Sequence, residues 1–245
     1  PGMNACIRAV IRACAHYNLE VFGIHRGYQG LIENEIHPMT ASSVANIIQM
    51  GGTILKTARS KEFMTPEGRK KAHENLKALG IEGLVCIGGN GTYTGAMIFE
   101  KEFGLPSIGC PGTIDNDLWG TDSTIGYDTA INTAMEAIDK IRDTADAHNR
   151  IFFIEVMGRH SGHIALHAGI AGGAEGIFIP ERGNEFADIV KLYEAKARKK
   201  EFSIFVVAEG EEEGHAYDIA KKFQGIYPDS DCKVTVLGHV QRGGR

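Results

Sequence analysis

The sequence lacks any long apolar run that could cross a membrane, and its N-terminus has no signal-peptide pattern. The one candidate, residues 3–16, is interrupted by Arg8 and Arg12 and has the spacing of an amphipathic helix. Excess positive charge is also lacking, since the net charge is −5 and 23% of residues are charged. Nucleic acid binding needs a basic field. We therefore expect a soluble, cytoplasmic protein with neither a membrane nor a nucleic acid as partner.

Cysteine is scarce and shows no pattern of pairing. The five cysteines are odd in number and include no CxxC spacing. Cys86 and Cys110 fall in predicted buried strands, where a thiol packs as a small hydrophobic group. This usage fits a reducing cytosol.

Low-complexity tracts and repeats of fixed period are absent too. Instead, β-like and helical segments alternate, which predicts an α/β protein with mostly parallel strands. The predicted strands are residues 20–24, 83–87, 106–110, 150–157, 176–180, 202–208 and 233–237. The predicted helices are residues 3–16, 42–50, 66–79, 92–103, 127–147, 162–171, 185–200 and 216–223.

An irregular loop, Pro111 to Asp117, carries Asp115 and Asp117 two positions apart. On its own it is more often a solvated turn than a catalytic loop. However, it follows one apolar strand, and a glycine-rich loop, residues 88–92, follows another. A strand, helix and strand in this order place both strands in one parallel sheet, and ligands bind beyond the carboxyl ends of such strands. We therefore expect the two loops to face one cleft.

The glycine-rich loop favours phosphate binding, because it brings backbone close to a ligand at the start of a helix. It is not a P-loop, since no Gly-Lys-Ser or Gly-Lys-Thr occurs in the chain. Gly89, Gly91 and Gly95 nearly match a dinucleotide fingerprint, but the third glycine is one place late and no clear ribose-binding acid follows. A simple tight turn between strand and helix remains an alternative.

Other polar residues also follow predicted strands. Met157-Gly158-Arg159 follows one, Glu209 follows the next, and the segment 238–242 with His239 and Arg242 follows another. Cations for phosphate, and acids for hydroxyls or metal, are typical of a phosphorylated-substrate site.

A series of short segments resembles the ATP-dependent 6-phosphofructokinase family of bacterial type (phosphofructokinase A), in the right order over the whole chain. They are PGMN at 1–4, GYQGL at 27–31, GGT at 51–53, TAR at 57–59, IGGNGT at 87–92, PGTIDND at 111–117, GTD at 120–122, IEVMGR at 154–159, AGGAE at 171–175 and LGHVQRGG at 237–244. Both ends of the chain read as loop segments, so we expect a piece of a longer protein.

The resemblance implies two three-layer α/β/α domains with the active site in the cleft between them. Residues 1–125 with 239–245 would bind ATP, and residues 126–238 would bind fructose 6-phosphate. The implied glycolytic reaction transfers a phosphoryl group from ATP to the 1-hydroxyl of fructose 6-phosphate. It implies Mg²⁺ as cofactor and a homo-oligomer, usually a tetramer, whose substrate sites are shared between subunits.

The resemblance also implies individual roles. Asp115 would be the base, with Thr113 and Asp117 holding the phosphoryl group and magnesium, and Arg59 and Arg159 beside them. The implied ATP-binding residues are Tyr28, Arg59, Gly89, Asn90, Gly91 and Thr92. The implied sugar-phosphate residues are Thr113, Ile114, Asp115, Met157, Gly158, Arg159, Glu209, His239, Val240, Gln241 and Arg242, with Arg150 and Lys233 supplied by a neighbouring subunit. The implied metal ligands are Asn90 and Asp117.

Several positions bear on donor, metal and regulation. Diphosphate-using relatives typically have Asp at position 91 and Lys at 112, so Gly91 and Gly112 favour ATP. Asn90 replaces a usual Asp, which removes a charge from the metal site, and Lys233 replaces a usual Arg. Part of the family's effector site is matched by Arg8, Arg12, Arg142, Gly173, Glu175, Arg198 and Lys200, whereas Ala41 and Asn46 depart from it. Allosteric control stays open.

Three alternatives remain on sequence grounds. A diphosphate-dependent phosphofructokinase, another small-molecule kinase with a related glycine-rich loop, or a catalytically weak nucleotide-sensing subunit could share these features. His160, His163 and His167 invite a zinc interpretation, but no third ligand is evident and we interpret them as packing or surface residues.

Overall fold

The computed structural model describes residues 1–148, 150–183, 186–196, 202–211 and 214–244. The chain divides into two compact units, residues 1–113 with the C-terminal end from Gly244, and residues 114–243. Residues 114–125 and 239–243, which we expected in the first domain, fall in the second unit. Within the described part of the chain, every helix is too short or too polar to span a bilayer.

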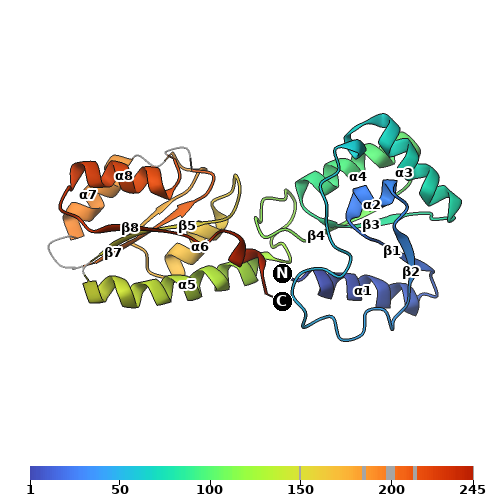
Figure 1. The fold of residues 1–245 in the computed structure, drawn as a ribbon, viewed down its shortest axis with the longest axis horizontal. Coiled ribbons are helices and arrows are strands. Elements are labelled where there is room, and N and C mark those ends of the chain that lie inside the picture. The colour runs from blue at the N-terminus through green and yellow to red at the C-terminus, as the bar shows by residue number, and fades with distance from the viewer. Residues whose placement is uncertain (149, 184–185, 197–201, 212–213, 245) are drawn as a thin grey trace. The chain divides into compact units, whose positions relative to one another are not determined.

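The first unit holds two small sheets (Figure 1). Strands β3 (Leu84–Gly88) and β4 (Ser107–Pro111) pair in parallel and are joined by helix α4 (Asn90–Phe103). Strands β1 (Val21–Ile24) and β2 (Ile36–Met39) pair antiparallel. One core includes residues of α2 (Gly27–Ile32), α3 (Pro66–Ala78), α4 and η1 (Glu62–Met64), and α1 (Met3–His16) lies in a second core.

One local prediction for this unit was wrong, and short elements were missed. The predicted helix at 42–50 is a series of turns, since Ala45 and Met50 donate their N–H groups three residues back. Val44 and Ile47 pack against α1, so a core contact produced the helical spacing. Strand β2 was missed because it is short and contains Pro38, which only an edge strand tolerates.

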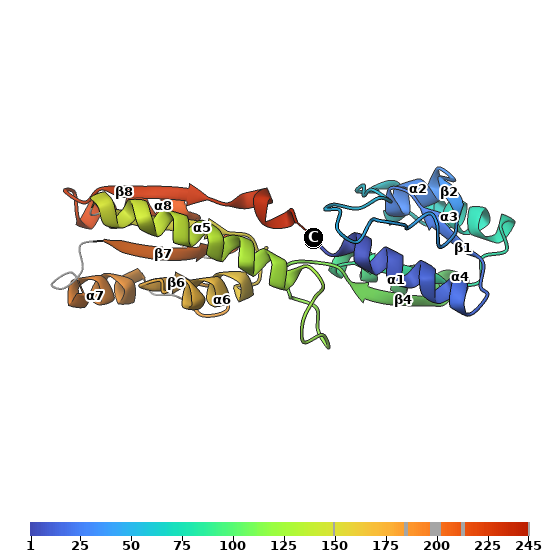
Figure 2. The same ribbon diagram turned by 90° about the horizontal axis from the view of Figure 1, so that it is seen from below.

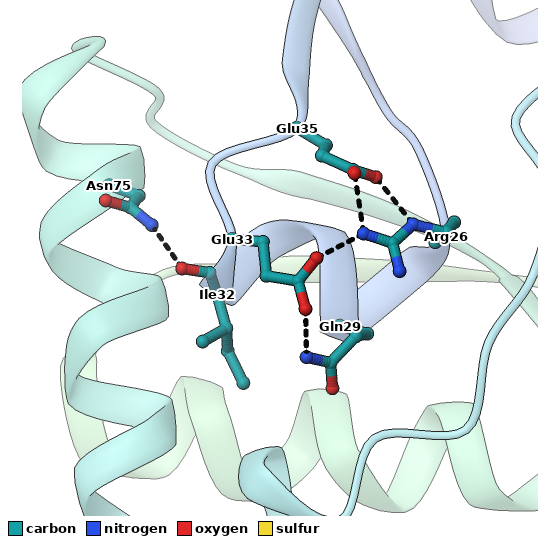
Figure 3. A network of polar contacts seen from close by, with 6 residues as sticks. All are labelled: Arg26, Gln29, Ile32, Glu33, Glu35 and Asn75. Atoms are coloured by element: carbon teal, nitrogen blue, oxygen red, sulfur yellow. Dashed lines mark hydrogen bonds and ion pairs between the residues drawn. The ribbon is translucent and has the colours of Figure 1, made fainter.

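Another missed element is α2, which a polar network supports (Figure 3). Arg26 adopts a left-handed conformation with φ 57° at its N-cap. Its Nε donates to Glu35 at 2.8 Å, and its guanidinium also pairs with Glu33. Asn75 of α3 donates to the Ile32 carbonyl at 3.1 Å. The network ties α2 to the start of β2, a contact that no periodic pattern predicts.

The second unit is a parallel sheet with helices on both faces, as Figures 1 and 2 show. Its strands, in the order β6-β7-β5-β8, are β6 (Gly176–Phe178), β7 (Ser203–Ala208), β5 (Ile151–Val156) and β8 (Cys232–Val236). Helices α5 (Tyr127–His148) and α6 (His163–Ala171) share one core with the sheet, and α7 (Phe186–Lys196) and α8 (Ala216–Ile226) share the other. The predicted parallel α/β order is confirmed here, with ends shifted by up to three residues; residues 185 and 197–200 of one predicted helix lie outside the described residues.

Asn4 fastens α1 to the turns that follow β2. Its side chain is 2% exposed, donates to the Met50 carbonyl at 3.0 Å and accepts from the Ile54 N–H at 2.8 Å. Replacing Asn4 with Ala removes both hydrogen bonds of this buried amide, so we expect the free energy of unfolding to fall by about 1–3 kcal/mol. Chemical denaturation would measure it. Asn132→Ala, at an exposed position of α5, is the control, and an equal loss there would contradict the role of Asn4.

Candidate functional site

The glycine-rich loop and the start of the acidic loop lie side by side in the first unit. Gly88 is the register partner of Pro111, and the Gly112 N–H donates to the Gly88 carbonyl at 2.8 Å. A Cβ placed on Gly89 would lie 3.3 Å from the Thr113 Cβ. This confirms that the two loops leave neighbouring parallel strands at the same edge.

The glycine-rich loop opens directly into α4. Gly89 is the N-cap, and its carbonyl accepts from Thr92 N at 3.0 Å and from Tyr93 N at 3.1 Å. A Cβ on Gly88 would lie 2.4 Å from the Thr92 Oγ1, so the tight turn needs glycine there. A Cβ on Gly91 would have nothing within 4 Å. The start of α4 therefore offers open space beside the positive end of a helix dipole, which suits a phosphate.

The two other residues predicted to bind ATP lie in different surroundings. Tyr28 stacks on Phe63 with ring centroids 3.9 Å apart and donates its hydroxyl to the Thr92 carbonyl at 2.6 Å. Burial raises the pKa of the Tyr28 hydroxyl well above its usual value. The structure thus shows Tyr28 as a support of the first turn of α4. Arg59 is exposed in the segment before η1 and makes no ion pair with any residue that the structure describes.

The rest of the acidic loop belongs to the second unit. Ile114 is buried in the core with α5, while Asp115 and Asp117 are half-buried. Between them, Asn116 has φ 54°, accepts from Thr124 N and donates to the Asp122 carbonyl. The sequence prediction overlooked Asn116, although a left-handed asparagine between two acids is a recognisable turn signal.

Two hydrogen bonds connect the residues that follow the carboxyl ends of β5 and β7. Glu209 accepts from the Arg159 N–H at 2.7 Å, and its own N–H donates to the Val156 carbonyl at 2.9 Å. A Cβ on Gly210 would lie 2.0 Å from the Arg159 carbonyl oxygen, so only glycine fits. The structure therefore brings Met157, Gly158, Arg159 and Glu209 together, with the Arg159 side chain exposed.

The segment after β8 forms η2 (Gly238–Arg242), which lies against α5. His239, Val240 and Arg242 are exposed there. Gln241 is 0% exposed, and neither polar atom of its amide has a hydrogen-bond partner among the described residues. The Gln241 side chain is thus packed in the interior, and its predicted contact with the sugar phosphate stays a prediction.

Arg150 and Lys233 lie at the opposite, amino-terminal edge of the same sheet. Arg150 precedes β5, and Lys233 is the register partner of Phe152. Both pair with Asp231, Arg150 Nε at 2.7 Å and Lys233 Nζ at 2.7 Å, and these cations lower the pKa of the Asp231 carboxyl, Lys233 the most. A strand of this length separates them from Arg159 by on the order of 20 Å. Asp231 was also overlooked, although it stands two positions before Lys233.

Four of the residues matched to an effector site, Arg8, Arg142, Gly173 and Glu175, make contacts within the protein. Arg8 donates to the Val44 carbonyl at 2.5 Å, and Arg142 donates to the Gly173 carbonyl at 3.3 Å and lies over the Phe202 ring. The buried Glu175 carboxylate accepts from Ile204 N at 2.7 Å. Arg12 is exposed, and Arg198 and Lys200 lie outside the described residues. An effector site therefore stays a prediction.

The histidines of α6 contact Tyr127. Its hydroxyl donates to the His163 carbonyl at 3.2 Å and makes a short contact with His167 Nδ1. Burial raises the pKa of Tyr127 to about 12. His163 and His167 thus link α6 to the start of α5, in agreement with a packing role.

A parallel α/β chain whose strand ends carry a phosphate-type glycine loop, paired acids and cations defines a phosphoryl-transfer class of protein. The Phosphofructokinase family model matches residues 1–245. Two relatives named ATP-dependent 6-phosphofructokinase, from Cytophaga hutchinsonii and Thermus thermophilus, are 56% and 57% identical over all of this chain and 75% and 76% of their own length. The chain belongs to the phosphofructokinase family.

A solved structure agrees with this membership. The phosphofructokinase of Saccharomyces cerevisiae superposes with a TM-score of 0.92 at 40% identity, over 100% of this chain and 37% of the yeast chain. The chain thus spans about three quarters of the curated relatives and a smaller part of the yeast subunit.

Proposed function

We infer that this chain transfers a phosphoryl group from ATP to fructose 6-phosphate, giving fructose 1,6-bisphosphate and ADP in glycolysis. The observation that carries this function is the parallel pairing of β3 with β4. It places the glycine-rich loop and Thr113, which follow these strands, at the same edge of the sheet. Relatives 56% and 57% identical are named for the same enzyme. A cytoplasmic location fits a glycolytic role.

We assign donor binding to the first unit. The open space at Gly91 and the N-terminus of α4 suit the phosphates of ATP. The supported position of Thr92, whose carbonyl accepts from Tyr28, would keep this turn in place. Arg59 would lie against the transferring phosphate, where a cation stabilises charge spreading onto its oxygens.

We assign acceptor chemistry to the second unit. Asp115 would take the proton of the 1-hydroxyl, and Asp117 would help hold the phosphoryl group. Arg159, whose backbone Glu209 fixes, is exposed and able to bind the sugar phosphate with its guanidinium fork. Met157, Gly158, His239, Val240 and Arg242 would line the sugar, and the buried Gln241 would support η2 from within.

The arrangement of two three-layer domains with the active site in a cleft stays a prediction.

Magnesium fits the side-chain oxygens of Asn90 and Asp117, the two implied metal ligands. Among the described residues, no three His, Cys, Asp or Glu side chains gather as a metal cluster. Mg²⁺, however, is commonly held by one or two oxygen side chains together with substrate phosphates. Asn90 and Asp117 would supply those oxygens, and the bound ion would offset phosphate charge.

The substrate site would be shared between subunits of a homo-oligomer, a tetramer by analogy with the family. The placement of Arg150 and Lys233 supports this proposal, because they lie at the sheet edge opposite Arg159 and Glu209. Within one subunit they cannot reach the same sugar phosphate, whereas a second subunit could present them.

The donor comparison tests the function directly. Full-length protein with fructose 6-phosphate, Mg²⁺ and ATP should release ADP and fructose 1,6-bisphosphate. Diphosphate should give no turnover, because this chain has Gly91 and Gly112 where diphosphate-using relatives typically have Asp and Lys. A coupled assay for the bisphosphate measures both reactions. Turnover with diphosphate but not ATP would favour the diphosphate-dependent alternative. Failure with both donors would favour the nucleotide-sensing subunit.

A further inference from the structure

Asn116 closes the loop that carries the two acids. Its Oδ1 accepts from the Thr124 N–H at 2.8 Å, and its Nδ2 donates to the Asp122 carbonyl at 3.3 Å. These bonds span eight and six residues, so one amide holds both ends of the segment 116–124. We call this pair of bonds the Asn116 clasp.

The clasp connects the acids to the core of the second unit. Thr124 is buried, and its carbonyl accepts from Tyr127 N at 3.2 Å at the start of α5. On the other side, Ile114 and Leu118 are both buried, which anchors the backbone on either side of the acids. Figure 2 shows this loop in green where the chain enters α5. The backbone that carries Asp115 and Asp117 is thus fixed at both ends and in the middle.

The backbone at Asn116 adds a second constraint. Its φ of 54° is left-handed, a conformation that asparagine tolerates better than most residues. Because Asn116 is bonded directly to both acids, its dihedral angles and side-chain bonds set the relative position of the two peptide units. A change at this residue therefore moves Asp115 relative to Asp117.

We propose that Asn116 is a positioning residue for phosphoryl transfer, whose amide clasp holds Asp115 and Asp117 in their working geometry. The proposal rests on the proposed function of these two acids. Displacement of a reacting group by about 1 Å can lower the rate about 10²-fold. The loss of two neutral hydrogen bonds at a half-buried position has a smaller effect on folding. The clasp should therefore matter for kcat more than for stability.

Asn116→Gly is the decisive variant, because glycine keeps the left-handed backbone and removes only the amide. We expect kcat to fall about 10- to 100-fold. The KM values for both substrates should change by less than about threefold, because the acids act mainly in the transition state. The melting temperature should fall by no more than about 4 °C. Asn18→Gly is the matched control, since Asn18 is exposed in the loop after α1 with φ 56° and should leave kcat unchanged.

Asn116→Asp separates positioning from general damage. The carboxylate still accepts from Thr124 N but cannot donate to the Asp122 carbonyl, so kcat should lie between those of the wild type and Asn116→Gly.

The proposal would be overturned if the Asn116→Gly variant had the kcat of the wild type. It would also be overturned if the variant showed a higher KM with kcat unchanged. A fall in kcat accompanied by a fall in melting temperature of much more than about 4 °C would also overturn it, because the loss of activity would then reflect unfolding. Wild-type turnover of fructose 6-phosphate with ATP tests the proposed function separately. Hydrogen exchange at the Thr124 amide tests the clasp without turnover: exchange should be faster in Asn116→Gly than in wild type, and equal protection would refute the clasp.

Discussion

Replacement of Asp115 with Asn is expected to lower kcat about 10²–10⁴-fold, the range that a positioned general base contributes. Asn is nearly isosteric with Asp, and Asp115 is half-buried in a loop anchored by the buried Ile114. The fold should therefore survive, while the group that we propose accepts the hydroxyl proton is lost. Steady-state kinetics with saturating fructose 6-phosphate and ATP measure the change.

The control for Asp115→Asn is Asp139→Asn, which removes the same charge from an exposed position of α5 in the same unit. It should leave kcat unchanged. Undiminished turnover by the variant would remove Asp115 from the mechanism and leave Asp117 as the acid to examine.

The sequence predicted the parts of the fold that depend on periodic burial. Strands β5 and β7 are buried at every position and, apart from Glu155 and Ser203, are apolar, as is typical of strands covered on both faces. The pairing of β3 with β4 followed from the handedness and proximity of a strand-helix-strand unit. The predicted neighbours at the sheet edge, the glycine-rich loop and Thr113, therefore came from topology alone.

The rest of the candidate site depends on contacts between side chains and distant backbone. The Asn116 clasp reaches residues six and eight positions away, and Asp231 joins Arg150 across 81 positions. Neither contact changes the pattern of apolar residues. Tyr28 adds a further contact of this kind, because it stacks on Phe63 and donates to the Thr92 carbonyl, while the ATP contact that the resemblance implies stays a prediction. Such roles require the packed structure.

Choice of phosphoryl donor can be tested at one of two glycines, and the structure favours Gly91. A Cβ at Gly112 would lie 2.8 Å from the Met3 Sδ and 3.3 Å from the Gly88 N, so any side chain there disturbs the sheet edge. A Cβ at Gly91 would meet nothing within 4 Å. An effect of substitution at Gly91 on activity would therefore not come from a clash in the fold.

Gly91→Asp should raise the KM for ATP about 10²-fold, because a carboxylate beside a bound phosphate costs several kcal/mol. The same substitution should stabilise the fold, since Gly91 is in the first turn of α4, where a negative charge is favoured by about 0.3–1 kcal/mol. A weaker enzyme with a higher melting temperature is an unusual pair of results, and misfolding cannot produce it. Gly91→Asn has nearly the same volume without the charge and should show a much smaller rise in KM. If Gly91→Asp uses ATP as well as the wild type does, the space at Gly91 is not part of the donor site, and the first turn of α4 would bind no phosphate of ATP.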